Sequence, residues 1–249
     1  MPYVHRRVEA GRTAEHKKMY SSRVHTKGVK RKPHFGATSE KQERINERVA
    51  EEKLRWKLNA NFDYGDYHTV FHYWNKCITL EQAERDRAAL LKELRKVYAT
   101  AGKKLKYIAV TETKHMTNIH HHIVLNRIDP QLIAQAWEQV TGGNGSVSFK
   151  MLDKRGNHYK LASYLVKESR STMVRYREMG KKHKRYTAST NLVQPKITYE
   201  VVQAASWRKE PKPRKGAQLY MFDDGSLCRS GWQDTTGWPY QEYFEVFNE

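Results

Sequence analysis

Residues 117–126, with the sequence TNIHHHIVLN, place three consecutive histidines in an apolar run. In a β-strand, successive side chains point to opposite faces of the sheet. His120 and His122 would therefore share one face, whereas His121 would point to the other face with the neighbouring isoleucines. Imidazole nitrogens are common metal ligands, so His120 and His122 are candidates to bind one cation. The alternative is a half-exposed strand whose histidines bind nothing.

The preceding segment supplies a carboxylate for the same face. Residues 105–113 are predicted to form a strand, and a five-residue turn would place Glu112 opposite His120. Two imidazoles and a carboxylate suit a divalent metal such as Mg²⁺ or Mn²⁺, with open positions for phosphate oxygens. The expected metal ligands are Glu112, His120 and His122. A register slip of one residue would turn Glu112 away and leave Glu168 as the alternative carboxylate.

A helix expected over residues 157–169 carries Tyr164 and Lys167, three positions apart and therefore on one helical face. A phenol with its ordinary pKa of about 10 is a poor nucleophile at neutral pH. A metal that polarises a phosphate, with a cation nearby, makes attack by Tyr164 feasible. Tyr159 lies off that face, so a single tyrosine nucleophile is expected. The alternative is an amphipathic helix that buries Tyr164 and leaves Lys167 in solvent.

The elements that position these residues follow from hydrophobic periodicity and capping residues. Strands are expected over 66–74, 105–113, 119–126 and 147–151, and helices over 39–62, 79–99, 129–140 and 157–169. Ser39, Thr79 and Asp129 are the expected N-caps. Two neighbouring strands joined by a short turn must be antiparallel, so we expect an α+β fold with helices packed on an antiparallel sheet.

Charge is the strongest feature of the whole chain. Its 249 residues hold 46 Lys and Arg against 27 acids, a formal net charge of +19, which favours a polyanionic partner. Fifteen Tyr, seven Phe and six Trp are available to stack on bases. A basic ribosome-associated protein is the alternative. Cys77 and Cys228 are too far apart in sequence to suggest a disulfide framework, and no segment resembles a signal peptide or membrane span, so a cytoplasmic protein is expected.

Charge and composition also divide the chain into three expected parts. Residues 1–60 would form a basic arm and a helix, residues 61–172 the core, and residues 173–249 a basic linker with an aromatic C-terminal extension. Residues 1–36 contain ten Lys and Arg against two Glu and show little periodicity, which is typical of a flexible arm. The aromatic extension is expected to add a few strands.

Together these motifs resemble those of the HUH endonucleases, and more narrowly the single-tyrosine rolling-circle replication initiators of plasmids and phages. The resemblance covers about residues 60–170 and implies a ferredoxin-like or RRM-like core. It assigns residues 66–74 to the first, hydrophobic motif, and it assigns His120 and His122 to the metal-binding motif. Glu112 would be the third metal ligand, while Tyr164 and Lys167 form the nucleophile motif. The chain departs from the family pattern at His121, where a hydrophobic residue is usual.

The resemblance implies a metal-dependent endonuclease and ligase that nicks single-stranded DNA or an origin hairpin through a 5′-phosphotyrosine intermediate. No GxxxxGK[ST] phosphate loop is present, so unwinding would depend on supercoiling or a host helicase, with a host polymerase extending the 3′ end. A tyrosine transposase of the same superfamily is the nearest alternative. Such enzymes carry a glutamine metal ligand where this chain has Glu168. Conjugative relaxases fit less well, because their tyrosine precedes the histidines, and a non-catalytic nucleic-acid-binding domain is the alternative from another class.

Overall fold

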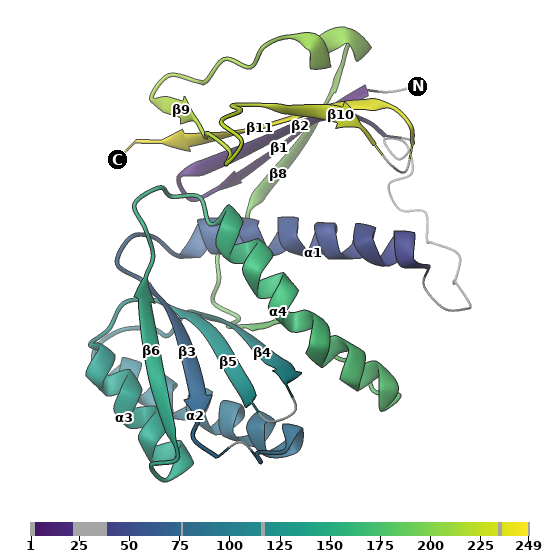
Figure 1. Cartoon of the computed structure of the whole chain (residues 1–249). Coiled ribbons are helices and arrows are strands. Elements are labelled where there is room, and N and C mark those ends of the chain that lie inside the picture. Colours follow the sequence, from purple (N-terminus) through teal and green to yellow (C-terminus); the bar gives the residue numbers. More distant parts are fainter. Residues whose placement is uncertain (1–2, 22–38, 76, 116–117, 234–235, 249) are drawn as a thin grey trace. The chain divides into compact units, whose positions relative to one another are not determined.

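The computed structural model describes residues 3–21, 39–75, 77–115, 118–233 and 236–248. These residues divide into two compact units, each built on its own antiparallel sheet (Figure 1). The expected α+β class is confirmed, but the sequence indicated one sheet and the structure contains two. Unit 1 comprises Met1–Ala60, Arg155–Asn157 and Val193–Glu249, and unit 2 comprises Asn61–Lys154 and His158–Leu192.

Unit 2 follows the order expected from the sequence. Its elements are β3 (Tyr67–Tyr73), α2 (Leu80–Thr100), β4 (Tyr107–His115), β5 (Asn118–Leu125), α3 (Pro130–Thr141), β6 (Gly145–Met151), α4 (Tyr159–Glu178) and β7 (Thr187–Ala188). The strands lie in the order β6-β3-β5-β4-β7, and every neighbouring pair is antiparallel. From β3 to β6 this is the βαββαβ arrangement of a ferredoxin-like sheet.

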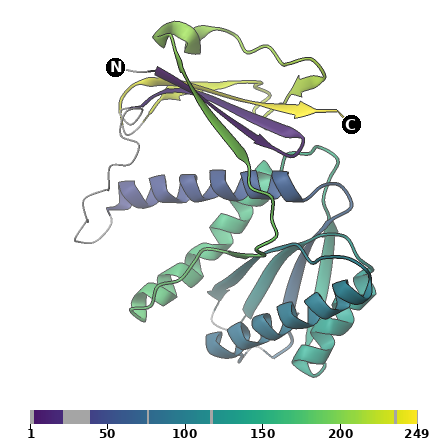
Figure 2. The same cartoon turned by 180° about the vertical axis from the view of Figure 1, so that it is seen from behind.

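The two faces of the unit 2 sheet are covered differently. Helices α2 and α3 lie on one face and α4 on the other, as Figures 1 and 2 show from opposite sides. The α2 and α3 face is the apolar core, in which Phe71, Ile123 and Leu125 pack with Leu90 and Trp137, and all five are fully buried. Because strand side chains alternate, the opposite face is free to carry polar residues.

The capping residues expected from the sequence begin the helices. The Thr79 hydroxyl accepts a hydrogen bond from the Gln82 amide at 3.1 Å, and the Asp129 carboxylate accepts one from the Gln131 amide at 3.0 Å. Pro130 follows at the first position of α3, where its missing N–H costs nothing. These caps explain why both helix starts are readable from local sequence.

Helix α4 continues nine residues beyond the expected end at residue 169 and stops at Glu178. The extension is stabilised by the polar face that α4 turns toward β4. The Thr172 hydroxyl donates to the carbonyl of Thr111 at 2.6 Å, and the Ser171 hydroxyl accepts from the amide of Thr113 at 3.2 Å. These contacts are hydroxyl–backbone bonds, so the buried side of this part of the helix lacks an apolar signature.

Unit 1 packs α1 (Glu40–Asn61) against a second sheet. The strands are β1 (Tyr3–Ala10), β2 (Thr13–Tyr20), β8 (Lys196–Val202), β9 (Ala217–Leu219), β10 (Arg229–Trp232) and β11 (Pro239–Phe247), with the short helix η1 (Ala204–Arg208). Their order is β10-β11-β2-β1-β8, and β9 also pairs with β11. The strands expected in the aromatic C-terminal extension are therefore present.

The prediction of a flexible basic arm is wrong for residues 3–20, which form the β1–β2 hairpin. Its charged side chains are paired rather than solvated. Glu15 on β2 accepts hydrogen bonds from the Arg55 guanidinium, one of them at 2.7 Å, and from the Trp56 indole at 2.7 Å. Arg6 forms an ion pair with Glu52 at 3.1 Å. Charges used in this way conceal the strand pattern. The rest of the expected arm, residues 22–36, lies outside the described residues.

The turn of this hairpin depends on Gly11. Its φ of +56° is a conformation that residues with a side chain rarely adopt, and an added Cβ would lie 2.0 Å from the Asn59 carbonyl oxygen. Trp56 packs against Val8 and Ala10 on the same side of the hairpin. The hairpin is thus fitted closely to the last turns of α1.

Candidate functional site

One row of paired residues crosses four neighbouring strands of unit 2. Ser146 on β6 is paired with His72 on β3, His72 with His120 on β5, and His120 with Glu112 on β4. The cross-strand pairing of Glu112 with His120 expected from the sequence is confirmed. Antiparallel pairing places the side chains of directly opposed residues about 5 Å apart on one face. The strand register therefore gathers these groups without help from a loop.

His121 occupies the opposite face, as strand alternation requires. It is fully buried, and its imidazole lies edge-on to Trp137. Its Nε2 is 3.1 Å from the Tyr73 hydroxyl and its Nδ1 is 3.0 Å from the Thr111 hydroxyl. Burial lowers the pKa of His121 to about 3, so the ring is neutral at physiological pH. His121 is a satisfied core residue.

Glu112 connects the two histidines that share its face. Its Oε2 lies 3.0 Å from Nε2 of His122 and 3.8 Å from Nδ1 of His120. The imidazoles of His120 and His122 hold the pKa of Glu112 well below its usual value, because they stabilise the ionised carboxylate. The structure thus brings together all three predicted metal ligands around a charged carboxylate.

The chemistry of this donor set fits a divalent cation. Two ligand atoms at right angles around Mg²⁺, each bonded at about 2.1 Å, lie about 3.0 Å apart. The separation of Glu112 Oε2 and His122 Nε2 matches that value. Among the described residues, no group of three or more His, Cys, Asp or Glu side chains has its donor atoms arranged as a metal site. The distance of 3.8 Å between His120 Nδ1 and Glu112 Oε2 is longer than this separation of about 3.0 Å.

Tyr164 lies on α4 beside the same histidines. Its ring is edge-on to His122, with centroids 5.4 Å apart, and edge-on to His68 at 5.9 Å. The side chain is 40% exposed, so a polymer substrate can reach it. Burial, followed by the negative charges of Glu168 and Glu112, raises the pKa of Tyr164, and the phenol is therefore protonated at neutral pH. Any attack by this hydroxyl needs an activating group nearby.

The two residues that follow Tyr164 by one helical turn behave differently. Lys167 is exposed, whereas Glu168 is half-buried and lies close enough to Glu112 to influence the pKa of its carboxylate. At about 100° per residue, Glu168 is about 40° from Tyr164 around the helix and Lys167 about 60° on the other side. The structure therefore brings Glu168 to the carboxylate and leaves Lys167, a predicted catalytic residue, at the surface.

A comparison with known protein families gives a match that falls on this site. Residues 63–169 match the family model of the replication-associated protein ORF2/G2P. The matched segment runs from just before β3 to the middle of α4, and so it includes Glu112, His120, His122 and Tyr164. No curated protein and no solved structure matches the chain. The similarity therefore covers less than half of the chain and is to a replication-associated protein.

Residues 63–169 contain a histidine that was not among the predicted site residues. His68 on β3 is buried, and its Nε2 lies 3.3 Å from Nδ1 of His122, with the two rings stacked at 5.5 Å. Burial, with a smaller contribution from His122, lowers the pKa of His68 to about 4. The signal was available, because His68 and His72 are four residues apart on a strand and must share a face.

His72 is a second histidine of this face that was not among the predicted site residues. Its ring is edge-on to His120 with centroids 4.5 Å apart, but its Nε2 faces the Ser148 hydroxyl at 3.3 Å. Burial, together with the nearby His120, lowers its pKa. The four histidines on this face thus form two pairs, His68 with His122 and His72 with His120.

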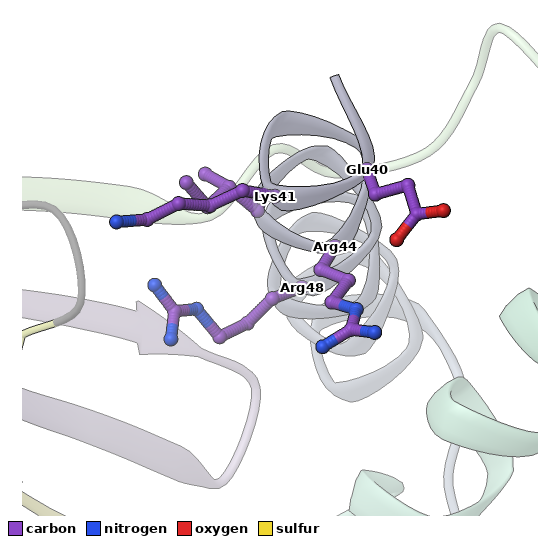
Figure 3. Close-up of a pocket in the computed structure, with 5 residues that line it drawn as sticks. Glu40, Lys41, Arg44 and Arg48 are labelled. Carbon is purple, nitrogen blue, oxygen red and sulfur yellow. The ribbon is translucent and has the colours of Figure 1, made fainter. Parts of the chain in front are cut away.

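A pocket of about 550 Å³ lies on unit 1, lined by Glu40, Lys41, Arg44, Ile45 and Arg48 of α1. Figure 3 shows Lys41 and Arg48 extending to one side of the helix, and Glu40 and Arg44 to the other. The lining of this pocket contains none of the predicted catalytic or metal-binding residues. Among the described residues, no helix is long and apolar enough to span a membrane.

Proposed function

We propose that this chain is a metal-dependent endonuclease that nicks and rejoins single-stranded DNA at an origin to start rolling-circle replication. The observation that carries the proposal is the contact of Tyr164 with His122, whose Nε2 lies 3.0 Å from the Glu112 carboxylate. A tyrosine hydroxyl, imidazole donors and an ionised carboxylate thus meet on the sheet face that α4 covers. The family match to a replication-associated protein supports the same reading.

In this proposal, Glu112, His120 and His122 would hold a Mg²⁺ or Mn²⁺ ion, which would polarise the scissile phosphate. The Tyr164 oxygen attacks phosphorus, and the bond from phosphorus to the 3′ oxygen breaks. The proton lost by the phenol balances the proton gained by the 3′ oxygen. The products are a 5′-phosphotyrosine and a free 3′-OH that a host polymerase can extend, with a host helicase or supercoiling opening the duplex.

Lys167 has a more distant part in this scheme. Its exposed ammonium is free to meet a phosphate of bound DNA, which would orient the strand rather than contact the metal ligands. The net charge of +19 supplies additional non-specific attraction to the backbone. Affinity would therefore come mostly from phosphate contacts, and the cleavage chemistry from Tyr164.

A labelled single-stranded oligonucleotide pool, incubated with the protein and Mn²⁺, tests the proposal. An adduct that survives denaturing electrophoresis, and that maps to Tyr164 by mass spectrometry, is the expected result. Binding that shifts the DNA in a native gel but leaves no covalent adduct would favour the non-catalytic nucleic-acid-binding alternative.

One observation favours a second candidate. Glu168 lies close enough to Glu112 to influence its pKa, and it occupies the helical position at which tyrosine transposases carry a metal ligand. In a transposase of this superfamily, the acid on the tyrosine helix would complete the metal site in place of Glu112 or beside it. Metal titration of variants at these two positions separates the candidates.

A further inference from the structure

His68 occupies a position for which the proposed chemistry has no use. It lies on β3, two strands away from Glu112, and its side chain is buried. It contacts the imidazole of His122 by a hydrogen bond and by stacking, and the ring of Tyr164 by an edge-on contact. A buried polar side chain costs stability unless its hydrogen bonds repay burial, so its partners indicate its role.

The two nitrogens of His122 face different partners. Nδ1 is 3.3 Å from Nε2 of His68, and Nε2 is 3.0 Å from Oε2 of Glu112. Because the nitrogens lie on different sides of one rigid ring, a contact on Nδ1 fixes the direction in which Nε2 points. Removal of His68 would leave the ring free to rotate about its bond to Cβ, or to flip.

We propose that His68 is a positioning residue that holds His122 in the orientation and tautomer needed to bind a divalent cation through Nε2. This inference rests on the proposed function, in which His122 is a metal ligand. When Nε2 binds a cation, the proton of neutral His122 is on Nδ1, and that N–H would donate to Nε2 of His68. His68 must then carry its own proton on Nδ1.

The contact with Tyr164 makes the same histidine pair a support for the nucleophile. The Tyr164 ring is edge-on to both His68 and His122, so the two imidazoles form a wall against which the phenol packs. His68 thereby joins the orientation of the metal ligand to that of the tyrosine. Loss of its hydrogen bond affects the ligand, whereas loss of its ring affects both.

Two substitutions separate these contributions. His68→Phe keeps an aromatic ring for stacking but cannot accept a hydrogen bond, and His68→Gln keeps an acceptor without the ring. The affinity for Mn²⁺, measured by calorimetry on the full chain without DNA, reports on the metal site independently of nicking. We expect His68→Phe to weaken Mn²⁺ binding by about 10- to 100-fold, as is typical when a hydrogen-bond partner of a metal ligand is lost, and His68→Gln to stay within a few-fold of wild type.

His72→Phe is the matched control, because His72 touches the other histidine ligand with its ring but directs its Nε2 to Ser148. It should bind Mn²⁺ within a few-fold of wild type. The inference is overturned if His68→Phe binds like wild type, if His72→Phe weakens binding as much, or if both His68 variants lose affinity and melting temperature equally. If His122→Ala also binds Mn²⁺ like wild type, the proposed metal site itself is refuted together with the inference.

Discussion

His121 and His122 are adjacent in the sequence and lie on opposite faces of β5. His122 directs Nε2 to Glu112, whereas His121 is enclosed in the core between Tyr73, Thr111 and Trp137. One residue of displacement along a strand thus separates a candidate metal ligand from a residue that supports the fold.

Alanine substitutions should therefore have different effects at neighbouring positions. We expect His120→Ala and His122→Ala to abolish nicking, and His122→Ala to cost some stability as well because His122 is buried. His121→Ala should retain nicking at low temperature but lower the free energy of unfolding by about 2–4 kcal/mol, because it leaves a cavity and two hydroxyls without their partner. Urea denaturation and an adduct assay on each variant measure the two effects. Equal loss of nicking in all three variants, at unchanged stability, would contradict the assignment of faces.

The third ligand is tested by two conservative substitutions. Glu112→Gln keeps the shape but removes the charge that a hard cation prefers, so the Mn²⁺ concentration needed for half-maximal nicking should rise about tenfold or more. Saturating Mn²⁺ should restore part of the activity. Glu168→Gln should have a much smaller effect, although Glu168 lies near Glu112. A larger effect of Glu168→Gln would place the ligand on α4 and favour the transposase-like candidate.

Acid should destabilise unit 2 through its buried histidines. Burial lowers the pKa of His121 to about 3 and of His68 to about 4, whereas an unfolded histidine titrates near 6.5. The unfolded chain therefore binds these protons at a higher pH than the folded chain, and stability that is fully present above about pH 6.5 is lost as the pH falls toward 4. Each histidine should cost about 2 kcal/mol between pH 7.5 and 5.

Urea denaturation at pH 7.5 and 5.0 measures this loss. His68→Gln removes one of the titrating groups, so its free energy of unfolding should fall less over the same interval than that of wild type. A wild-type free energy that does not change between these two pH values would show that the histidines are not buried in neutral form.

Local sequence signals were sufficient for most of unit 2. The caps at Thr79 and Asp129 are formed by side chains within three residues of the amides they bind, and the alternation around His121 is a property of any strand. The pairing of Glu112 with His120 follows from the short turn between their strands. Contacts of this kind are encoded by neighbours in the chain, and so they can be predicted from one sequence.

Contacts between segments far apart in the sequence could not be predicted in this way. Strand β1 pairs with β8, so that Arg6 lies opposite Tyr199, and nothing in either segment specifies the other. The hairpin of unit 1 was missed because its charges are used in ion pairs with α1. The spacing of His68 and His72 places both on one face of β3, but nothing in that strand specifies His122, on another strand, as the hydrogen-bond partner of His68.

The packing of the β1–β2 hairpin on α1 can be tested by substitution of Glu15. Glu15→Ala would leave the buried guanidinium of Arg55 without the carboxylate that accepts its hydrogen bonds and would remove the acceptor of the Trp56 indole. Breaking a buried pair in this way should lower the free energy of unfolding by about 3–5 kcal/mol. Exposed Lys53→Ala on the same helix is the control and should change it by less than about 0.5 kcal/mol. Stability unaffected by Glu15→Ala would mean that residues 3–20 are not packed on α1.

The most direct test of the central claim is adduct formation by Tyr164→Phe. The substitution keeps the ring that packs against His122 and removes only the hydroxyl, so single-stranded DNA binding should stay within a few-fold of wild type while the covalent adduct disappears. Tyr159→Phe, on the same helix, is the matched control and should still form the adduct. A Tyr164→Phe protein that still forms a denaturant-resistant adduct with labelled DNA would show that another residue is the nucleophile and would contradict the account.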